Sequence, residues 1–273
     1  MSRAQQMLTC VAIAGSALGL SSCSASNPDE SGLAEATPGV VAVEEQTPSP
    51  TPTVEVEDEV EDQLYRTGEG TEIEIDGVSK SITDPDSLWV IVNKHNPLPA
   101  SYAPTDLVTP NMPRKGEHQE LRAEAAKALM AMSKAADHEV GKPLQLVSGY
   151  RSYTDQKEVY DRYVAKDGQA AADTYSARAG FSEHQTGLVA DLSTVAGKME
   201  KFGDTKLGEW TAKNAWKFGF ILRYTPENQS VAGYQSEPWH FRYVGIELAK
   251  YYHDNEIASL EQLFNQPAAP DYK

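Results

Sequence analysis

Apolar residues recur along the last two thirds of this chain at the three- and four-residue intervals of helices. Between residues 118 and 140 they form one stripe, which predicts an amphipathic helix that ends at Gly141, shortly before Pro143. Shorter patterns of the same kind predict further helices at residues 155–166, 210–218, 246–252 and 258–264.

Short apolar runs between these helices predict strands. They cover residues 144–148, 188–192, 220–224 and 240–244, and a buried segment at 87–93 precedes a proline-rich loop. Alternating residues at 71–77 are compatible with one more short strand. Helices and short strands mix without a regular βαβ alternation, so the predicted fold class is α+β.

The N-terminus has the pattern of a processing segment. An apolar run from Met7 to Leu20 is too short to span a bilayer comfortably and fits the core of a signal peptide. The run ends in Leu-Ser-Ser-Cys, which resembles a bacterial lipobox and implies that Cys23 becomes the lipidated first residue. We therefore predict a lipoprotein signal peptide at residues 1–22, with an ordinary signal peptide or an uncleaved anchor as alternatives.

The following segment is acidic and poor in apolar residues. The formal net charge is −16, and eleven acidic residues but no Lys or Arg lie between Ser24 and Tyr65. Proline and like charges favour extended chain that cannot offset its ordering entropy, which predicts a disordered linker at residues 23–83. The folded domain is then expected at 84–265, with a tail at 266–273. The acidic balance excludes a nucleic-acid surface.

Two histidine-containing clusters offer metal chemistry. Both cysteines lie within the first 23 residues, so a metal in the folded domain must use His, Asp or Glu. His184 and Asp191 are seven residues apart, and His240 follows in a predicted strand. Such a set suits a catalytic zinc, and a metal would offset the cost of a carboxylate at the end of an apolar strand. The spacing alone also fits a core histidine and a surface carboxylate.

Glu237, three residues before His240, is the candidate general base. Pro238 biases Glu237 toward an extended conformation, so its side chain is expected to reach the site from the loop that enters the strand. There it can take a proton from the attacking water and pass it to the leaving amine.

Four motifs, in order, resemble the zinc D-alanyl-D-alanine carboxypeptidases of the VanY type. They are SGYRSYTDQ from Ser148, SEHQTGLVAD from Ser182, NAWKFGFILRY from Asn214 and GYQSEPWHFRYVG from Gly233. The resemblance spans about residues 88–250 and implies a hedgehog/D,D-peptidase-like fold with a small antiparallel sheet flanked by helices. It also implies one zinc per chain, held by His184, Asp191 and His240, with Glu237 as the base.

The same resemblance assigns roles in substrate binding. Arg151 would polarise the scissile carbonyl and stabilise its oxyanion. Gln156, Ser182 and Tyr224 match positions that hold the terminal D-alanine. Trp239 is expected to be either a wall of the pocket or a core residue.

Together these features predict a zinc carboxypeptidase that removes the terminal D-alanine from peptidoglycan stem peptides. We favour D,D-carboxypeptidase action on pentapeptides over L,D-carboxypeptidase action on tetrapeptides, and an endopeptidase is a third alternative. A non-catalytic zinc module that binds cell wall or a partner would need neither Glu237 nor Arg151. The enzyme is expected outside the cytoplasm, as a monomer anchored to the membrane through Cys23.

Overall fold

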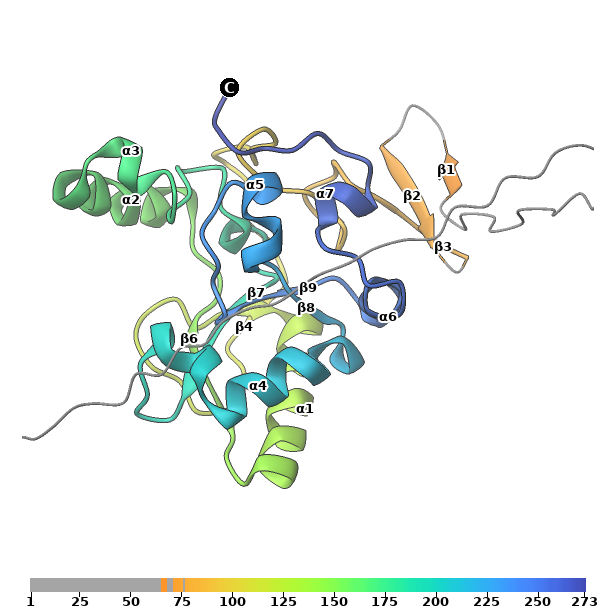
Figure 1. Ribbon diagram of the computed structural model, residues 1–273, viewed down its shortest axis with the longest axis vertical. Helices are drawn as coiled ribbons and strands as arrows, with labels where there is room; N and C mark the ends of the chain where they lie inside the picture. The colour runs from red at the N-terminus through yellow and green to blue at the C-terminus, as the bar shows by residue number, and fades with distance from the viewer. Residues whose placement is uncertain (1–64, 68–70, 76) are drawn as a thin grey trace, which may run out of the picture. The chain divides into compact units, whose positions relative to one another are not determined.

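The computed structural model describes residues 65–67, 71–75 and 77–273 (Figure 1). The predicted signal peptide, the lipidation site Cys23 and most of the predicted linker lie outside the described residues. Within the described part of the chain, no helix combines the length and apolar character needed to cross a membrane.

A four-stranded antiparallel sheet lies at the centre, with the strand order β6-β7-β9-β8. Its strands are β6 (Leu144–Ser148), β7 (Val189–Thr194), β8 (Phe220–Leu222) and β9 (His240–Tyr243), so all four predicted strands are confirmed to within two residues at each end. The register pairs Asp191 of β7 with Ser148 on one side and with His240 on the other. Polar residues from three strands therefore meet in one row across the sheet.

The helices agree broadly with the predicted pattern. They are α1 (Ala123–Val140), α2 (Tyr153–Asp167), α3 (Gln169–Ala172), α4 (Lys206–Asn214), α5 (Gln229–Ala232), α6 (Ile246–Asp254) and α7 (Leu260–Leu263). α2 begins at residue 153 rather than 155 because Ser152 and Asp155 form a reciprocal capping box. The helix predicted at 210–218 is α4 followed by a 3₁₀ turn, which Gly219 ends in a left-handed conformation.

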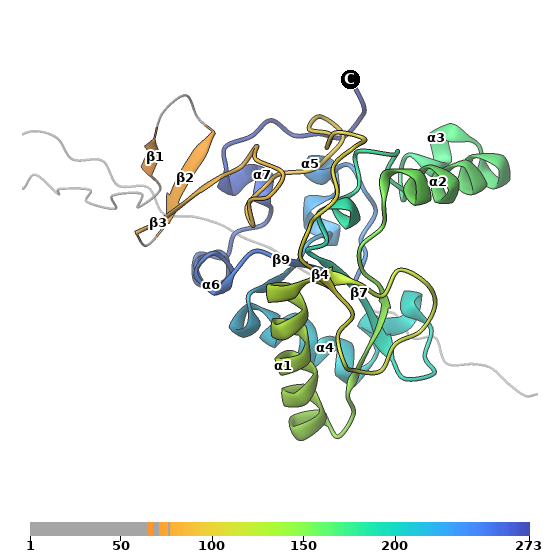
Figure 2. The same cartoon turned by 180° about the vertical axis from the view of Figure 1, so that it is seen from behind.

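Two apolar clusters hold these elements together. The larger one joins α1 and α4 to β6, β7 and β9, and both views show α1 and α4 on the same side of the sheet (Figures 1 and 2). The second joins α6 and α7 to Trp89 and Ile91 of the segment predicted to be buried. Helices and small antiparallel sheets thus form the predicted α+β fold.

A small sheet near the start of the described chain belongs to the second cluster. It consists of β1 (Tyr65–Thr67), β2 (Glu72–Ile75) and β3 (Val78–Ser81), in that order. Ile73 and Ile75 are fully buried beside Leu248 of α6. This sheet lies in the segment expected to be linker up to residue 83. The short strand considered at residues 71–77 is confirmed as β2, whereas β1 and β3 were not predicted. The isoleucines of β2 belong to the folded domain rather than to the linker, because they are buried in the second cluster.

We predict that Ile75→Ala destabilises the whole folded domain. Truncating a fully buried isoleucine removes apolar contacts and leaves a cavity, which costs about 2–5 kcal/mol. Denaturant unfolding of the full chain measures this change. Ile246→Ala is the matched control, because Ile246 is 55% exposed and its truncation should change the free energy of unfolding little. Equal effects of the two substitutions would show that β2 does not belong to the cooperative unit.

Candidate active site

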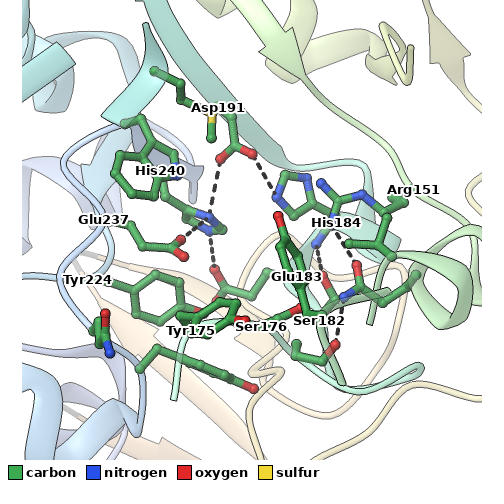
Figure 3. Close-up of a pocket in the computed structure, with 18 of the residues that line it drawn as sticks. Arg151, Tyr175, Ser176, Ser182, Glu183, His184, Asp191, Tyr224, Glu237 and His240 are labelled. Carbon is green, nitrogen blue, oxygen red and sulfur yellow. Dashed lines mark hydrogen bonds and ion pairs between the residues drawn. The ribbon is translucent and has the colours of Figure 1, made fainter. Parts of the chain in front are cut away.

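Three side chains converge at the middle of the sheet. Asp191 lies opposite His240 in the β7–β9 pair, and His184 comes from the 3₁₀ turn Glu183–Thr186 just before β7. Asp191 Oδ2 lies 3.2 Å from His184 Nε2, and Asp191 Oδ1 lies 3.4 Å from His240 Nδ1 (Figure 3). One ligand atom from each of the three residues falls within 4.8 Å of the others, so a single ion can contact all three.

The two histidines present different ring nitrogens to the common centre. His184 Nδ1 lies 2.6 Å from the carbonyl oxygen of Gly149, which can only accept, so this nitrogen carries the proton and Nε2 keeps its lone pair. Gly149 itself packs closely against the backbone of Glu120, with which a Cβ at this position would collide. His240 turns its Nε2 toward Glu183 and its Nδ1 toward the centre.

The electrostatics of this group fit a divalent cation. Burial raises the pKa of Asp191, but the facing rings of His184 and His240 outweigh burial and hold that pKa well below its usual range. Burial also lowers the pKa of His184, which favours a neutral imidazole. Asp191 Oδ1 is buried and has no hydrogen-bond donor. Burial lowers the pKa of His240, but Asp191, Glu183 and Glu237 outweigh it and hold that pKa well above its usual value, so a metal that binds Nδ1 would release a proton there. Asp191 and His184 already have the protonation states that a zinc ligand needs.

Glu237 borders the same centre from the turn that enters β9. Its Oε2 lies 3.2 Å from His240 Nδ1, and its backbone NH donates to Tyr224. Burial raises the pKa of Glu237, with His240 opposing the shift. Glu237 thus reaches the centre from the turn before the strand, as expected from the sequence. Its raised pKa suits a group that takes up a proton in one step of a reaction and releases it in the next.

Arg151 lies on the other side of the cavity in a fixed orientation. One terminal nitrogen donates to Gln156 Oε1 at 2.7 Å and the other to Ser148 Oγ at 3.0 Å. Gln156 in turn donates to the carbonyl of Ala177 at 2.6 Å. The Gln156 amide thus positions Arg151. Gln156 also lines the cavity, and the second hydrogen of its Nε2 is not used by these bonds. Arg151 Nε is buried and has no acceptor among the described residues.

These groups line a cavity of about 330 Å³. Ser182, Tyr224 and Trp239 also line it, and Trp239 packs partly against the larger apolar cluster as well. The Tyr224 ring lies 4.7 Å from the His240 ring, and burial raises the Tyr224 pKa well above its ordinary value, so its hydroxyl stays a donor. Further residues that line the cavity were not proposed as site residues from the sequence, among them Tyr163, Tyr175, Met199, Glu200 and Tyr234.

A buried ionic network behind His240 was not predicted. Glu183 Oε1 accepts from Arg223 Nε at 2.9 Å and from Arg242 Nη1 at 3.0 Å, and Arg223 also pairs with Glu261. All four side chains are at most 1% exposed. The sequence does contain one indication of this network, an arginine within each of the mostly apolar strand segments 220–224 and 240–244. An arginine that is fully buried needs an acidic partner.

Glu183 links this network to the centre. Its Oε2 lies 3.3 Å from His240 Nε2, and Figure 3 shows His240 between Glu183, Glu237 and Asp191. Burial raises the pKa of Glu183, but Arg223 and Arg242 outweigh it and keep the carboxylate ionised. An ionised carboxylate holds the proton of His240 on Nε2, which leaves Nδ1 free to bind a metal.

Comparison with known proteins agrees with this chemistry. The sequence model of the VanY family, described as D-alanyl-D-alanine carboxypeptidase, matches residues 118–246. The chain is 41% identical to YodJ of Bacillus subtilis over 199 residues, which cover 70% of this chain and 72% of YodJ.

Two solved structures are also similar. The LdcB LD-carboxypeptidase is 40% identical, with a TM-score of 0.63 over 71% of this chain and 92% of LdcB. The D,D-pentapeptidase VanY of a VanB-type resistance cassette, solved as a mutant in complex with Zn(II), is 32% identical, with a TM-score of 0.54 over 64% of this chain and 97% of that chain.

We predict that Glu183→Gln weakens zinc binding roughly 10–100-fold, as expected when a carboxylate behind a ligating histidine is lost. Competition of the metal-free protein with a chromophoric chelator measures this affinity. Glu261→Gln is the matched control: it removes an equivalent charge from the network without touching His240. Both variants should lose stability, but only Glu183→Gln should lose zinc affinity. Equal affinities would exclude a role of Glu183 at the metal.

Proposed function

Because the chain belongs to the VanY family of D-alanyl-D-alanine carboxypeptidases, we propose that it is a zinc-dependent carboxypeptidase of peptidoglycan stem peptides that removes their terminal D-alanine. The observation that carries this proposal is the convergence of Glu237 and Arg151 on the His184–Asp191–His240 group within one cavity. A module that only bound zinc would need neither side chain.

Zinc held by His184, Asp191 and His240 would supply Lewis acidity toward the scissile carbonyl and acidify the attacking water. Glu237 then acts as the proton carrier. Its buried carboxylate takes the proton of the attacking water and returns it to the nitrogen of the departing D-alanine. Two other carboxylates beside the centre are not free for this role, since Asp191 faces both histidines and Glu183 is paired with two arginines.

Arg151 supplies positive charge where negative charge develops. Gln156 and Ser148 hold its guanidinium before the substrate arrives, so little reorganisation is needed as the carbonyl becomes an oxyanion. Two of the five N–H groups of the guanidinium are used by Gln156 and Ser148, and others are left to donate.

The free carboxylate of the terminal residue requires donors in the same cavity. The hydroxyl of Tyr224, kept protonated by burial, and the hydroxyl of Ser182 line the cavity and can donate to it. An exopeptidase uses such donors to exclude substrates whose chain continues beyond the cleaved bond.

The residue on the acyl side distinguishes two forms of this activity. We favour the D,D-carboxypeptidase, which acts on pentapeptides, and the similarity to the zinc-containing D,D-pentapeptidase VanY supports it. The L,D-carboxypeptidase, which acts on tetrapeptides, is the second candidate. It is favoured by the higher identity and TM-score of LdcB, 40% and 0.63 against 32% and 0.54 for VanY.

We predict that the purified protein releases one alanine from defined pentapeptide stems, and that a chelator stops the reaction. Mass spectrometry of tetra- and pentapeptide muropeptides measures the products. Glu237→Gln is the control: kcat should fall about 10²–10⁴-fold while zinc stays bound. Release of alanine from tetrapeptides alone would identify the L,D form. Internal cleavage, or activity that resists chelation, would contradict the proposal.

We further propose that the enzyme is a lipoprotein outside the cytoplasm. The lipobox-like Leu20-Ser-Ser-Cys23 supports this location, and the acidic residues that follow would serve as a tether to the membrane. The substrate proposal requires the same side of the membrane, since peptidoglycan stems lie there.

We predict that Cys23→Ser moves the protein from the membrane fraction to the soluble fraction or blocks its maturation. The reason is that serine cannot accept a thioether-linked lipid. Fractionation and immunoblotting of cells that express each form measure the change. An unchanged membrane fraction would indicate an uncleaved anchor instead.

A further inference from the structure

The segment after α7 does not leave the domain as a free tail. In Figure 1 it runs from α7 back past α5 to the mark C. There, residues 269–272, here called the clamp segment, contact two loops. The first loop is residues 176–182. The second is residues 231–236, which begins in the last residues of α5, and both contribute residues that line the active-site cavity.

Tyr272 contacts both loops through its hydroxyl. This oxygen accepts a hydrogen bond from the backbone NH of Arg178 at 2.8 Å and lies 3.2 Å from the hydroxyl of Tyr234. Arg178 belongs to the first loop and Tyr234 to the second, so one hydroxyl joins the two.

The ring of Tyr272 adds contacts to the first loop. It packs edge-on against Phe181, with the ring centroids 5.0 Å apart, and the guanidinium of Arg178 lies 4.0 Å from its centroid. Phe181 directly precedes Ser182 of the cavity, so these contacts reach the cavity wall.

Backbone contacts fix the clamp segment to the second loop. The Ala269 NH donates to Val231 at 2.7 Å, and the buried Lys94 donates to the carbonyls of both Gly233 and Pro270. Gly233 has a φ of +83°, and a Cβ there would collide with the carbonyl of Ala269. A glycine is therefore required for this close approach.

A continuous series of aromatic rings leads from the clamp segment to the centre. Tyr234 packs against Tyr224 with the ring centroids 5.4 Å apart, and Tyr224 packs against His240 at 4.7 Å. Tyr234 is only 4% exposed and lines the cavity. A displacement of Tyr234 would therefore move Tyr224, one of the proposed substrate donors.

We propose that Tyr272 is a positioning residue that holds the two loops at the spacing needed to bind the terminal residue of the stem peptide. This inference rests on the proposed carboxypeptidase function. The clamp segment lies outside residues 118–246, which match the family model. The wall of the substrate pocket thus depends on a part of this chain beyond the matched region.

The test compares Tyr272→Ala, Tyr272→Phe and Trp216→Ala in the full chain. Tyr272→Ala should raise backbone hydrogen exchange in residues 176–182 and 231–236 and raise KM for the pentapeptide about tenfold. Its kcat and zinc content should stay as in the wild type. Tyr272→Phe keeps the ring contacts with the first loop but removes the hydroxyl that joins the two loops, so its KM should lie between those of the wild type and Tyr272→Ala. Trp216, which stacks on His253 and contacts neither loop, controls for the loss of an aromatic contact and should leave KM unchanged.

Unchanged exchange in both loops, or a fall in kcat together with loss of zinc, would overturn the clamp. A rise in KM of the same size in Trp216→Ala would do the same, because it would indicate general destabilisation. If the wild type cleaves no stem peptide, the proposed function fails. Hydrogen exchange then still decides whether Tyr272 holds the two loops.

Discussion

The site depends on one pairing between two strands, Asp191 of β7 opposite His240 of β9. Side chains alternate between the faces of a strand, so a slip of either strand by one residue would turn one ligand away from the other. The register is secured by burial on both sides of the pair, since Ala190, Leu192 and Phe241 are fully buried. Packing of the core and assembly of the metal ligands are therefore the same event.

Behind this pair, the protein buries two carboxylates and two guanidinium groups, which together are neutral. Taking four charges out of water costs much of what their attraction returns, so the network is weak support for stability. The network instead fixes the orientation of Glu183. Its Oε1 accepts hydrogen bonds from both arginines, which leaves Oε2 for His240. The position of one imidazole is thereby tied to Arg242 of β9, to Arg223 directly after β8 and, through Glu261, to α7.

The sequence allowed the four central strands, most helices and the ligand set to be predicted, because each depends on local periodicity or on a contiguous motif. The strand at 71–77 was considered, but its place in the folded domain was not predicted, because Ile73 and Ile75 are buried against residues far along the chain such as Leu248 of α6. Glu183 lies beside His184 in the best-defined motif, yet its partners Arg223 and Arg242 are about forty and sixty residues away. Tyr272 was assigned to a tail for the same reason: its contacts are all long-range.

The opposite use of ring nitrogens by the two histidines has a consequence for how each position can vary. His184 faces the centre with Nε2, which lies about as far from the backbone as the amide oxygen of a glutamine. His240 faces it with Nδ1, which lies about as far from the backbone as the amide oxygen of an asparagine. The two positions therefore accept different replacement side chains. If both histidines were replaced by glutamine, or both by asparagine, one of the two side chains would be too long or too short to reach the ion. The two ligand atoms lie at different distances from their own backbones, so a redesign for another cation would have to choose the replacement side chain at each position separately.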